Sequence, residues 1–260
     1  VLANISKDIQ VNFKDVLTKW SIPIKNFNLI GKIEKGKIVK LSSKSEFSEN
    51  EFLDISLKKE FMSNKKILEI YSDIPRAILG DYNFFNGVNG GKLLLTNKFD
   101  KDLNETNIVI KNFKVKDVPT FAKLLTLADF GGISDLLSGD GISFEKLEIN
   151  TINDGKVLKI NEIFAVGPSI SILIDGYIDK KTGLVSLRGT MVPAKDLNKL
   201  ISKIPLLGDI LIPKDIGEGL FGVSFKMKGV PGKIKTTVNP IKTLTPRFIT
   251  KALEKRKKAN

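Results

Sequence analysis

The 260-residue sequence contains no cysteine and no histidine. Without cysteine the protein has no disulfide, no zinc–thiolate site and no cysteine nucleophile. Without histidine, Ser-His-Asp and Cys-His catalysis are excluded, as is any metal site built on imidazole. Long apolar runs are also missing, because no stretch approaches the roughly 20 apolar residues that span a bilayer. Carboxylates, lysine, serine and tyrosine remain for an enzyme. From the whole sequence we expect no enzyme, no catalytic residue, no metal site and no cofactor.

Arginine is scarce in an otherwise basic chain. Lysine and arginine together number 42 against 29 acidic residues, but the only arginines are Arg76, Arg188, Arg247 and Arg256. Arginine is the side chain that commonly recognises bases and binds phosphates through two hydrogen bonds. The lysines are spread along the whole chain and do not form one stripe. We expect no nucleic-acid partner, and the net charge of +13 favours anionic lipid headgroups more.

Most of the sequence alternates apolar and polar residues with period two, which is typical of half-buried strands. Turn sequences separate several segments, at residues 34–37 (EKGK), 153–156 (NDGK) and 179–183 (DKKTG). Such short connections favour antiparallel neighbours, because parallel strands need crossovers of a dozen or more residues. We predict a mainly β, antiparallel protein. Its strands are expected at residues 27–33, 37–47, 51–60, 66–73, 91–98, 106–116, 143–151, 156–165, 168–178, 183–192, 219–229 and 232–239.

Short amphipathic helices are expected between the strands, at residues 75–85, 118–137 and 193–211, and the tail at 246–258 is basic and weakly amphipathic. The first and third segments begin with proline, which suits the first position of a helix. The predicted helix 118–137 carries Phe121, Leu124, Leu125 and Ala128 on one face. The predicted helix 193–211 is expected to cap the end or edge of the sheet through its apolar face. That face consists of Leu197, Leu200, Ile201, Ile204 and Leu207.

Two glycine-containing motifs suggest ligand loops, but their surroundings do not fit. Gly217, Gly219 and Gly222 form a G-x-G-x-x-G pattern, which binds dinucleotides when it follows a strand and opens a helix. Here an alternating strand follows it, so we interpret these as glycines of a turn and a strand. The stretch SGDGIS at 138–143 lacks the alternating oxygen ligands of a calcium loop, and we predict a turn there.

Two polar pairs suggest catalysis equally weakly. Ser63 and Lys66 match the S-x-x-K spacing of serine–lysine acyl enzymes, but the supporting motifs of that chemistry are absent. Asp135 and Asp140 could serve as acid and base only if an apolar pocket separated their pKa values, and nothing in the sequence around them supplies one.

The apolar faces of the predicted strands are the main functional candidates. Along 168–178, for example, Ile170, Ile172 and Ile174 share one face, while Ser169, Ser171 and Leu173 occupy the face that we expect to be solvated. These faces either fill a closed core or line an open groove for acyl chains, and periodicity alone does not separate the two. The candidate lining residues are Ile170, Ile172, Ile174, Val185, Leu187, Met191, Phe221, Val223, Phe225 and Met227.

Three stretches of the sequence, 117–149, 164–212 and 219–248, resemble the C-terminal region of the AsmA-like family, and its YhdP-type members most of all. The ordered features are LLSGDGISF, G-T-x-V-P-A before a helix, IPLLGDIL, F-x-V-S-F-x-x-x-G, V-N-P and L-T-P-R-F. The resemblance covers roughly residues 75–250, whereas residues 1–74 fit only as further strands. LIPKDIGEG stands where a more glycine-rich loop is expected.

This resemblance implies a periplasmic protein of double-membrane bacteria, anchored at the inner membrane and carrying phospholipid toward the outer membrane. It implies a long curved antiparallel sheet forming an open, taco-like groove, with short helices at its ends or edges. The anchor helix, and any leader, is expected outside this chain. The expected units are a strand segment at 1–74 that continues an upstream groove, an AsmA-like C-terminal domain at 75–250 and a basic tail at 251–260.

The expected partners are phospholipid acyl chains and, in addition, outer-membrane or periplasmic proteins. An alternative function is that of a non-catalytic β scaffold, which supports outer-membrane assembly or envelope integrity through protein contacts. Lysines near the rim of the groove are expected to favour anionic headgroups. The two functions differ in geometry, because an open trough supports lipid transport and a filled core supports scaffolding.

Overall fold

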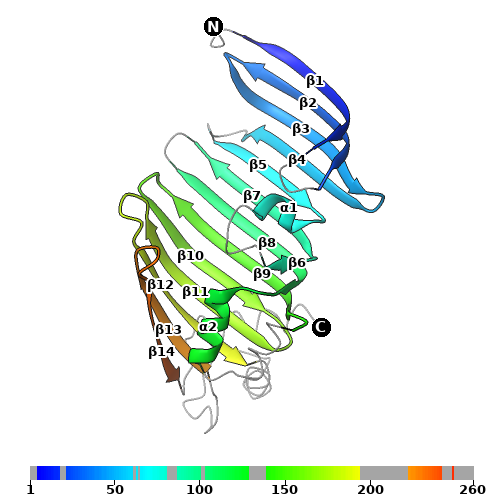
Figure 1. Cartoon of the computed structure of the whole chain (residues 1–260). Helices are drawn as coiled ribbons and strands as arrows, with labels where there is room; N and C mark the ends of the chain where they lie inside the picture. The colour runs from blue at the N-terminus through cyan, green and yellow to red at the C-terminus, as the bar shows by residue number, and fades with distance from the viewer. Residues whose placement is uncertain are drawn as a thin grey trace, which may run out of the picture.

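The structure of the chain, a computed structural model, describes residues 5–17, 22–60, 63, 65–80, 87–100, 103–128, 139–193, 222–241 and 248. Most of these residues belong to a single antiparallel sheet of 14 strands (Figure 1). The strands follow one another in chain order from β1 to β14, except that the short β6 pairs with β8 and lies off this path. β1 and β14 do not pair with each other, so the sheet is open.

The elements have the following bounds. The strands are β1 (Lys7–Val16), β2 (Ile24–Glu34), β3 (Lys37–Ser48), β4 (Glu51–Lys59), β5 (Lys66–Ser72), β6 (Val88–Asn89), β7 (Lys92–Phe99), β8 (Asn104–Val115), β9 (Ile142–Asn153), β10 (Val157–Val166), β11 (Ile170–Asp179), β12 (Val185–Pro193), β13 (Gly222–Gly229) and β14 (Lys235–Ile241). The helices of the described residues are α1 (Pro75–Leu79) and α2 (Pro119–Leu127).

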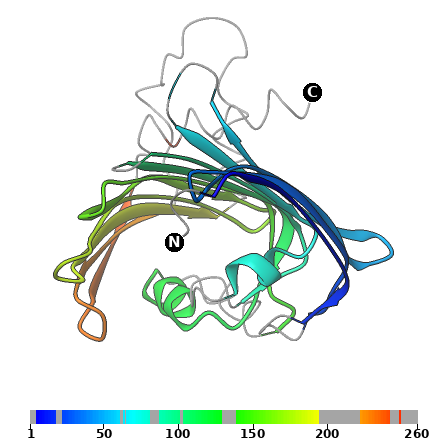
Figure 2. The same ribbon diagram turned by 90° about the horizontal axis from the view of Figure 1, so that it is seen from above.

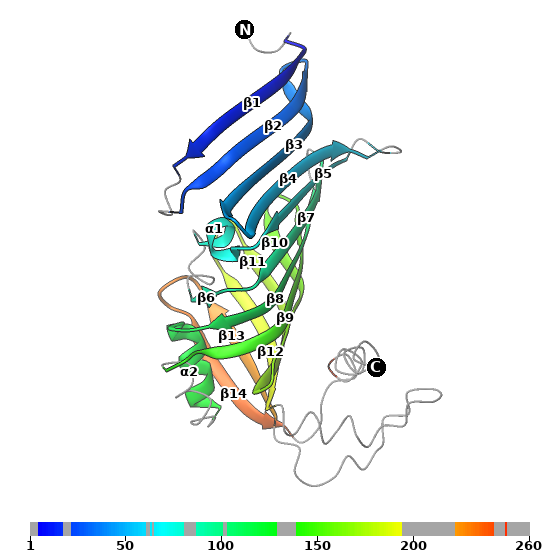
Figure 3. The same cartoon turned by 90° about the vertical axis from the view of Figure 1, so that its right-hand side faces the viewer.

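The sheet is curved into an arch, and both helices lie on its inner side (Figure 2). The face that carries the helices is called the inner face below, and the opposite one the outer face. Figure 3 shows that the strands stack one behind another along the length of the molecule, from β1 at one end to β14 at the other. With strands spaced about 4.8 Å apart, the twelve steps from β1 to β14 give the arch a length of about 58 Å.

Tight turns make this chain-order stacking possible. In the β2–β3 hairpin, Lys35 and Gly36 both have positive φ (49° and 71°), as a two-residue type I′ turn requires. In the β9–β10 hairpin, Gly155 has a φ of 86°, and the Asp154 carboxylate accepts hydrogen bonds from the N–H groups of Lys156 and Val157. Local turn chemistry therefore fixes the strand pairing that the sequence indicates.

The helices pack against the inner face through their apolar sides. Leu124 and Leu125 of α2 join the main hydrophobic cluster of the sheet, and Phe121 lies 6.4 Å from Phe144 of β9 between ring centroids. Ala77 of α1 belongs to a second cluster with Leu53 of β4. Each helix thus buries part of the inner face, and both lie toward the same long edge of the arch.

The predicted fold class is confirmed: the protein is mainly β, antiparallel and curved, with short helices. All twelve predicted strands are present, within a few residues of the expected bounds. The two helices start at or beside the predicted positions and have shorter described extents, at Pro75–Leu79 and Pro119–Leu127. β1 and the two-residue β6 were not predicted. The predicted helix 193–211 and nearly all of the tail 246–258 lie outside the described residues.

Candidate functional site: the inner groove

The inner face carries an unbroken row of uncharged residues that runs the length of the arch. Residues paired directly across neighbouring strands point to the same face of a sheet, so the register defines such rows. The central row has one residue on each strand of the main path. In strand order it consists of Val11, Leu29, Ser43, Ile55, Ile70, Leu95, Ile108, Ile149, Ile163, Ile174, Gly189, Phe225 and Val238.

Two further rows flank the central row. The helix-side row lies toward α1 and α2 and consists of Ser45, Leu53, Ser72, Leu93, Ile110, Leu147, Ala165, Ile172, Met191, Val223 and Pro240. The hairpin-side row lies toward the tight turns and consists of Ile9, Gly31, Leu41, Leu57, Leu68, Asn97, Thr106, Thr151, Ile160, Gly176, Leu187, Met227 and Thr236. None of the three rows contains a charged residue.

The helices cover one part of this surface and leave the rest accessible. In the helix-side row Leu93, Ile110 and Met191 are fully buried. In the central row Leu95 and Ile108 are only half-buried. Solvent therefore reaches an apolar strip beside the helices, and the inner face combines a packed core with an open groove.

The predicted lining residues lie on this inner face where the structure describes them. Five are buried in the main cluster, and four are half-buried nearer the open side. The buried ones are Ile170, Ile172, Met191, Val223 and Phe225, and the half-buried ones are Ile174, Val185, Leu187 and Met227. Phe221 and the predicted capping residues Leu197, Leu200, Ile201, Ile204 and Leu207 lie outside the described residues.

Polar side chains interrupt the hairpin-side row at one place only between its ends, and sequence reasoning missed it. Asn97, Thr106 and Thr151 stand side by side on β7, β8 and β9. The three are far apart in the sequence, and each alone is an ordinary polar residue in an alternating strand. Only the pairing register, which the sequence does not give, brings them together.

The groove edge beside the hairpin-side row, called the hairpin edge below, carries exposed lysines. Each of the four described hairpins at residues 34–37, 153–156, 179–183 and 230–233 contributes at least one: Lys35, Lys37, Lys156, Lys180, Lys181 and Lys233. The acidic residues there hold the turns. Hydrogen bonds from the N–H groups of Val157 and Lys156 lower the pKa of Asp154, and those from Thr182 lower the pKa of Asp179. Both carboxylates therefore stay ionised and engaged with their own turns.

The outer face is less uniformly solvated than the alternation predicts. Ser171 and Leu173, expected on the wet side, are both buried. Phe248 packs on this part of the sheet: its ring lies edge-on to Phe164, the direct partner of Leu173, with centroids 6.3 Å apart on the outer face of β10. The expectation of a wet outer face is therefore wrong at this end of β10–β12. Elsewhere the outer face is mixed: it carries an Asn107–Asn150 hydrogen bond of 2.7 Å between β8 and β9, and exposed apolar side chains such as Leu94 and Phe52.

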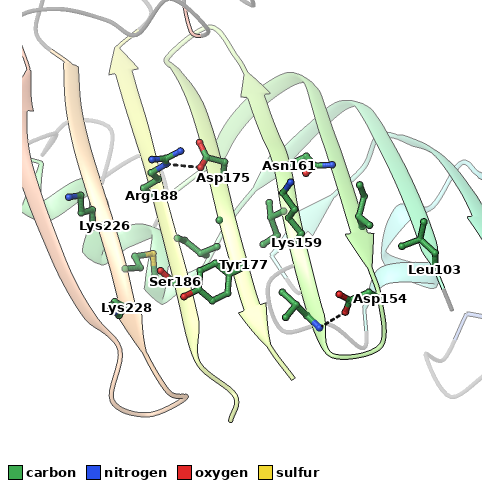
Figure 4. Close-up of a pocket in the computed structure, with 16 residues that line it drawn as sticks. Leu103, Asp154, Lys159, Asn161, Asp175, Tyr177, Ser186, Arg188, Lys226 and Lys228 are labelled. Atoms are coloured by element: carbon green, nitrogen blue, oxygen red, sulfur yellow. Dashed lines mark hydrogen bonds and ion pairs between the residues drawn. The ribbon is translucent and has the colours of Figure 1, made fainter. Parts of the chain in front are cut away.

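A hollow of about 1000 Å³ lies on the outer face over β9–β13 (Figure 4). Lys159, Lys226 and Lys228 line it together with the exposed ring of Tyr177. Arg188 crosses from β12 to β11, where its Nε donates to Asp175 Oδ1 over 2.7 Å. The hollow is thus rich in cations, and it lies on the opposite side of the sheet from the apolar groove.

The remaining sequence motifs do not assemble into sites within the described residues. Gly222 begins β13, which confirms that a strand follows the glycine pattern, while Gly217 and Gly219 are not described. The Ser63 hydroxyl donates to Glu60 and the Lys66 ammonium to the carbonyl of Ile38, so these two side chains have separate partners. Asp140 is exposed beside Gly141, whose φ of 87° marks a turn, and Asp135 lies outside the description.

Across the described ranges, acidic side chains form no group of three that could hold a metal ion. The helices described here include none with the length and apolarity to cross a membrane.

Comparison with known proteins gives no relative. No family model, no curated protein sequence and no solved structure matches the chain.

Proposed function

We propose that this chain is a segment of a lipid-transfer protein, and that its inner groove carries the acyl chains of phospholipids between the inner and outer bacterial membranes. The observation that carries the proposal is the central row, which is uncharged on all thirteen strands that it crosses and half-buried at every position except the buried Ser43, Ile149 and Phe225. In a closed core such a strip would be buried away from solvent.

The energetics favour hydrocarbon as the occupant. Each methylene group that leaves water for an apolar surface gains about 0.8 kcal/mol, so an acyl chain crossing an aqueous space needs a continuous apolar track. A charge in the track would have to lose its hydration against the chain, at a cost of several kcal/mol. The length of the arch, about 58 Å by strand spacing, exceeds the roughly 30 Å hydrocarbon core of a bilayer. More than one lipid can therefore lie along the groove in sequence.

Transfer of this kind is non-catalytic, because it makes and breaks no covalent bond and needs only binding and sliding. The AsmA-like resemblance of the sequence supports the proposal of a periplasmic protein with an inner-membrane anchor. The lysines of the hairpin edge, such as Lys156 and Lys181, are exposed where headgroups would meet solvent. Their charge suits anionic headgroups.

Two consecutive leucines of β7 provide the test. Leu95 belongs to the central row and is half-buried, whereas Leu94 points to the outer face with 47% of its surface exposed. We propose placing a photo-crosslinking residue at either position in the full-length protein in its native cells. Crosslinked phospholipid at position 95 and none at position 94 is the expected result. Crosslinks to protein alone at position 95 would reject the lipid groove.

The outer-face hollow supports a second candidate, the non-catalytic scaffold that acts through protein contacts. Two of its exposed residues, Tyr177 and Arg188, are of types enriched in protein interfaces. Crosslinking from position 177 tests it. Scaffold function predicts a defined protein adduct there, together with a normal envelope phenotype when the groove is blocked at Leu95.

A further inference from the structure

The groove has a polar window in its wall. In the hairpin-side row, Asn97, Thr106 and Thr151 are direct partners on three adjacent strands, β7, β8 and β9. The central-row residues beside them on the same strands are Leu95, Ile108 and Ile149. Within one short section the groove therefore changes from hydrocarbon to amide and hydroxyl groups.

The window is bounded on both sides along the groove. Toward β1 the same row continues with Leu41, Leu57 and Leu68. Toward β14 it continues with Ile160 and, past Gly176, with Leu187 and Met227. The neighbouring residues of the same row are apolar. The position of the row in the groove therefore does not by itself explain why Asn97, Thr106 and Thr151 are polar.

The next positions outward continue the polar path. Asn104 and Asn153 pair with each other on β8 and β9, one alternate position beyond Thr106 and Thr151. Both are half-buried. Beyond them lies the β9–β10 hairpin with the exposed Lys156. Apolar, uncharged polar and charged groups thus follow one another from the bottom of the groove to its edge, which is also the order of parts in a phospholipid.

One acceptor in the window is unused. The Oδ1 atom of Asn97 is buried and has no hydrogen-bond donor in the described part of the protein. A buried polar atom without a partner is destabilising, and a ligand donor that meets it after a rotation of the Asn97 amide relieves this cost. Threonine hydroxyls and the asparagine N–H groups can in turn donate to ester carbonyls.

We infer that this window holds the uncharged glycerol-ester section of a glycerolipid whose acyl chains lie along the central row. The inference rests on the proposed lipid-carrying function and adds a defined binding position to it. Thr106, Thr151 and the Asn97 N–H groups donate to the ester carbonyls. Asn97 Oδ1 accepts a hydroxyl group of the glycerol unit or headgroup, and the headgroup leaves over Asn104 and Asn153.

The test removes the hydrogen bonds and keeps the shapes. The variant Asn97→Leu/Thr106→Val/Thr151→Val is compared with wild type for two probes, an acyl-labelled phosphatidylglycerol and the pure hydrocarbon diphenylhexatriene. We expect diphenylhexatriene to bind both proteins within about twofold. Phosphatidylglycerol affinity should fall by about tenfold or more in the variant, because each lost hydrogen bond weakens binding severalfold. Circular dichroism and urea unfolding check that the variant is folded.

Thr96→Val is the matched control. Thr96 lies on β7 beside Asn97 but on the outer face, where its direct partners are Glu69 and Asn107, and it is also half-buried. Its substitution should leave the affinity for both probes unchanged. Should the triple variant fail to fold, Thr106→Val and Thr151→Val are measured singly, each with an expected loss of a few-fold for phosphatidylglycerol alone.

The outcomes separate the two proposals. Equal phosphatidylglycerol affinity in the wild type and the triple variant overturns the window and leaves the groove intact. An equal loss with Thr96→Val also overturns it, because the effect would not be confined to the groove. A wild-type protein that binds neither probe overturns the lipid-carrying function, and the window with it.

Discussion

The phenyl ring of Phe225 lies against Gly189 on the neighbouring strand, so closely that a Cβ atom on Gly189 would stand 2.3 Å from the ring's Cζ atom. The two residues are direct partners in the central row. The ring therefore fills the place that a side chain on β12 would take, and one residue supplies the apolar surface of two strands.

The first prediction follows from this contact. Gly189→Ala should destabilise the protein by about 1–3 kcal/mol, because the new methyl group forces the fully buried Phe225 and its surroundings apart. Urea unfolding followed by circular dichroism measures the change as a lower midpoint. In a Phe225→Leu background the cost of Gly189→Ala should shrink. An undiminished cost would show that the obstacle is the carbonyl of Leu173, which would lie 2.7 Å from the same Cβ.

A second prediction concerns charge in the groove. Ile108→Lys places an ammonium group in the half-buried centre of the central row, where passing acyl chains would have to strip its water. We expect lipid recovered with the purified protein to fall several-fold, with little change in stability. Leu94→Lys adds the same charge to the outer face of the adjacent strand and should leave the bound lipid unchanged. Mass spectrometry of extracted lipid gives the readout. Equal lipid content in both variants and wild type would reject the groove as the binding surface.

A third prediction tests the hairpin edge. Lys180→Glu/Lys181→Glu should reduce binding to vesicles that contain anionic phospholipid, and the loss should diminish at high salt because exposed charges are screened. Lys40→Glu/Lys44→Glu, on the exposed outer face of β3, makes the same change in net charge and is the control. Flotation assays at two salt concentrations measure both variants. If the control loses as much binding, overall charge and not the edge attracts the lipid.

A fourth prediction concerns a clasp at the end of β4, β5 and β7. The carboxylate of Asp73 accepts hydrogen bonds from the Tyr71 hydroxyl (2.6 Å) and the Phe52 N–H (3.0 Å), and it pairs with the Lys92 ammonium (3.1 Å). Burial by itself raises the pKa of Asp73, but these partners outweigh burial and hold the pKa below its ordinary value. Asp73→Asn should cost about 1–3 kcal/mol of unfolding free energy at neutral pH.

The pH dependence of this clasp has a definite sign. Because the pKa of Asp73 is lower in the folded than in the unfolded protein, its contribution is complete above the unfolded value of about 4. It disappears as the pH falls through the folded value. Unfolding free energies of wild type and Asp73→Asn should therefore differ at pH 6 and converge below about pH 4. A difference that stays constant down to pH 3 would mean that the carboxylate's charge is not what stabilises this end of the strands.

The strands and their apolar faces could be read from the sequence because period-two alternation and turn residues are local signals. β1 carries the same local signal, because Ile9, Val11 and Phe13 alternate with polar residues, but it was not among the predicted strands; Phe13 stays 56% exposed. The burial of Leu173 could not be read from local signals. Phe248, which packs against the neighbouring Phe164, comes from far along the chain, and no alternation pattern records what packs on the second face of a strand.

The polar window marks the limit of sequence reasoning for the candidate site. Asn97, Thr106 and Thr151 come together only when three strands pair in one register, and the bulge in β10 between Ile160 and Ile163 shifts that register once more. A one-residue slip would exchange the inner and outer faces of a strand, so a site of this kind depends on pairings that no single segment specifies.

The chain-order stacking of the strands has a consequence for how the arch can change in evolution. Since almost every strand touches only the strands before and after it, inserting or deleting a whole hairpin alters the length by about 10 Å without changing which face any other side chain occupies. The length of such a molecule is therefore set by its number of hairpins. It can be adjusted to the distance it has to cover while the chemistry of its surface stays the same.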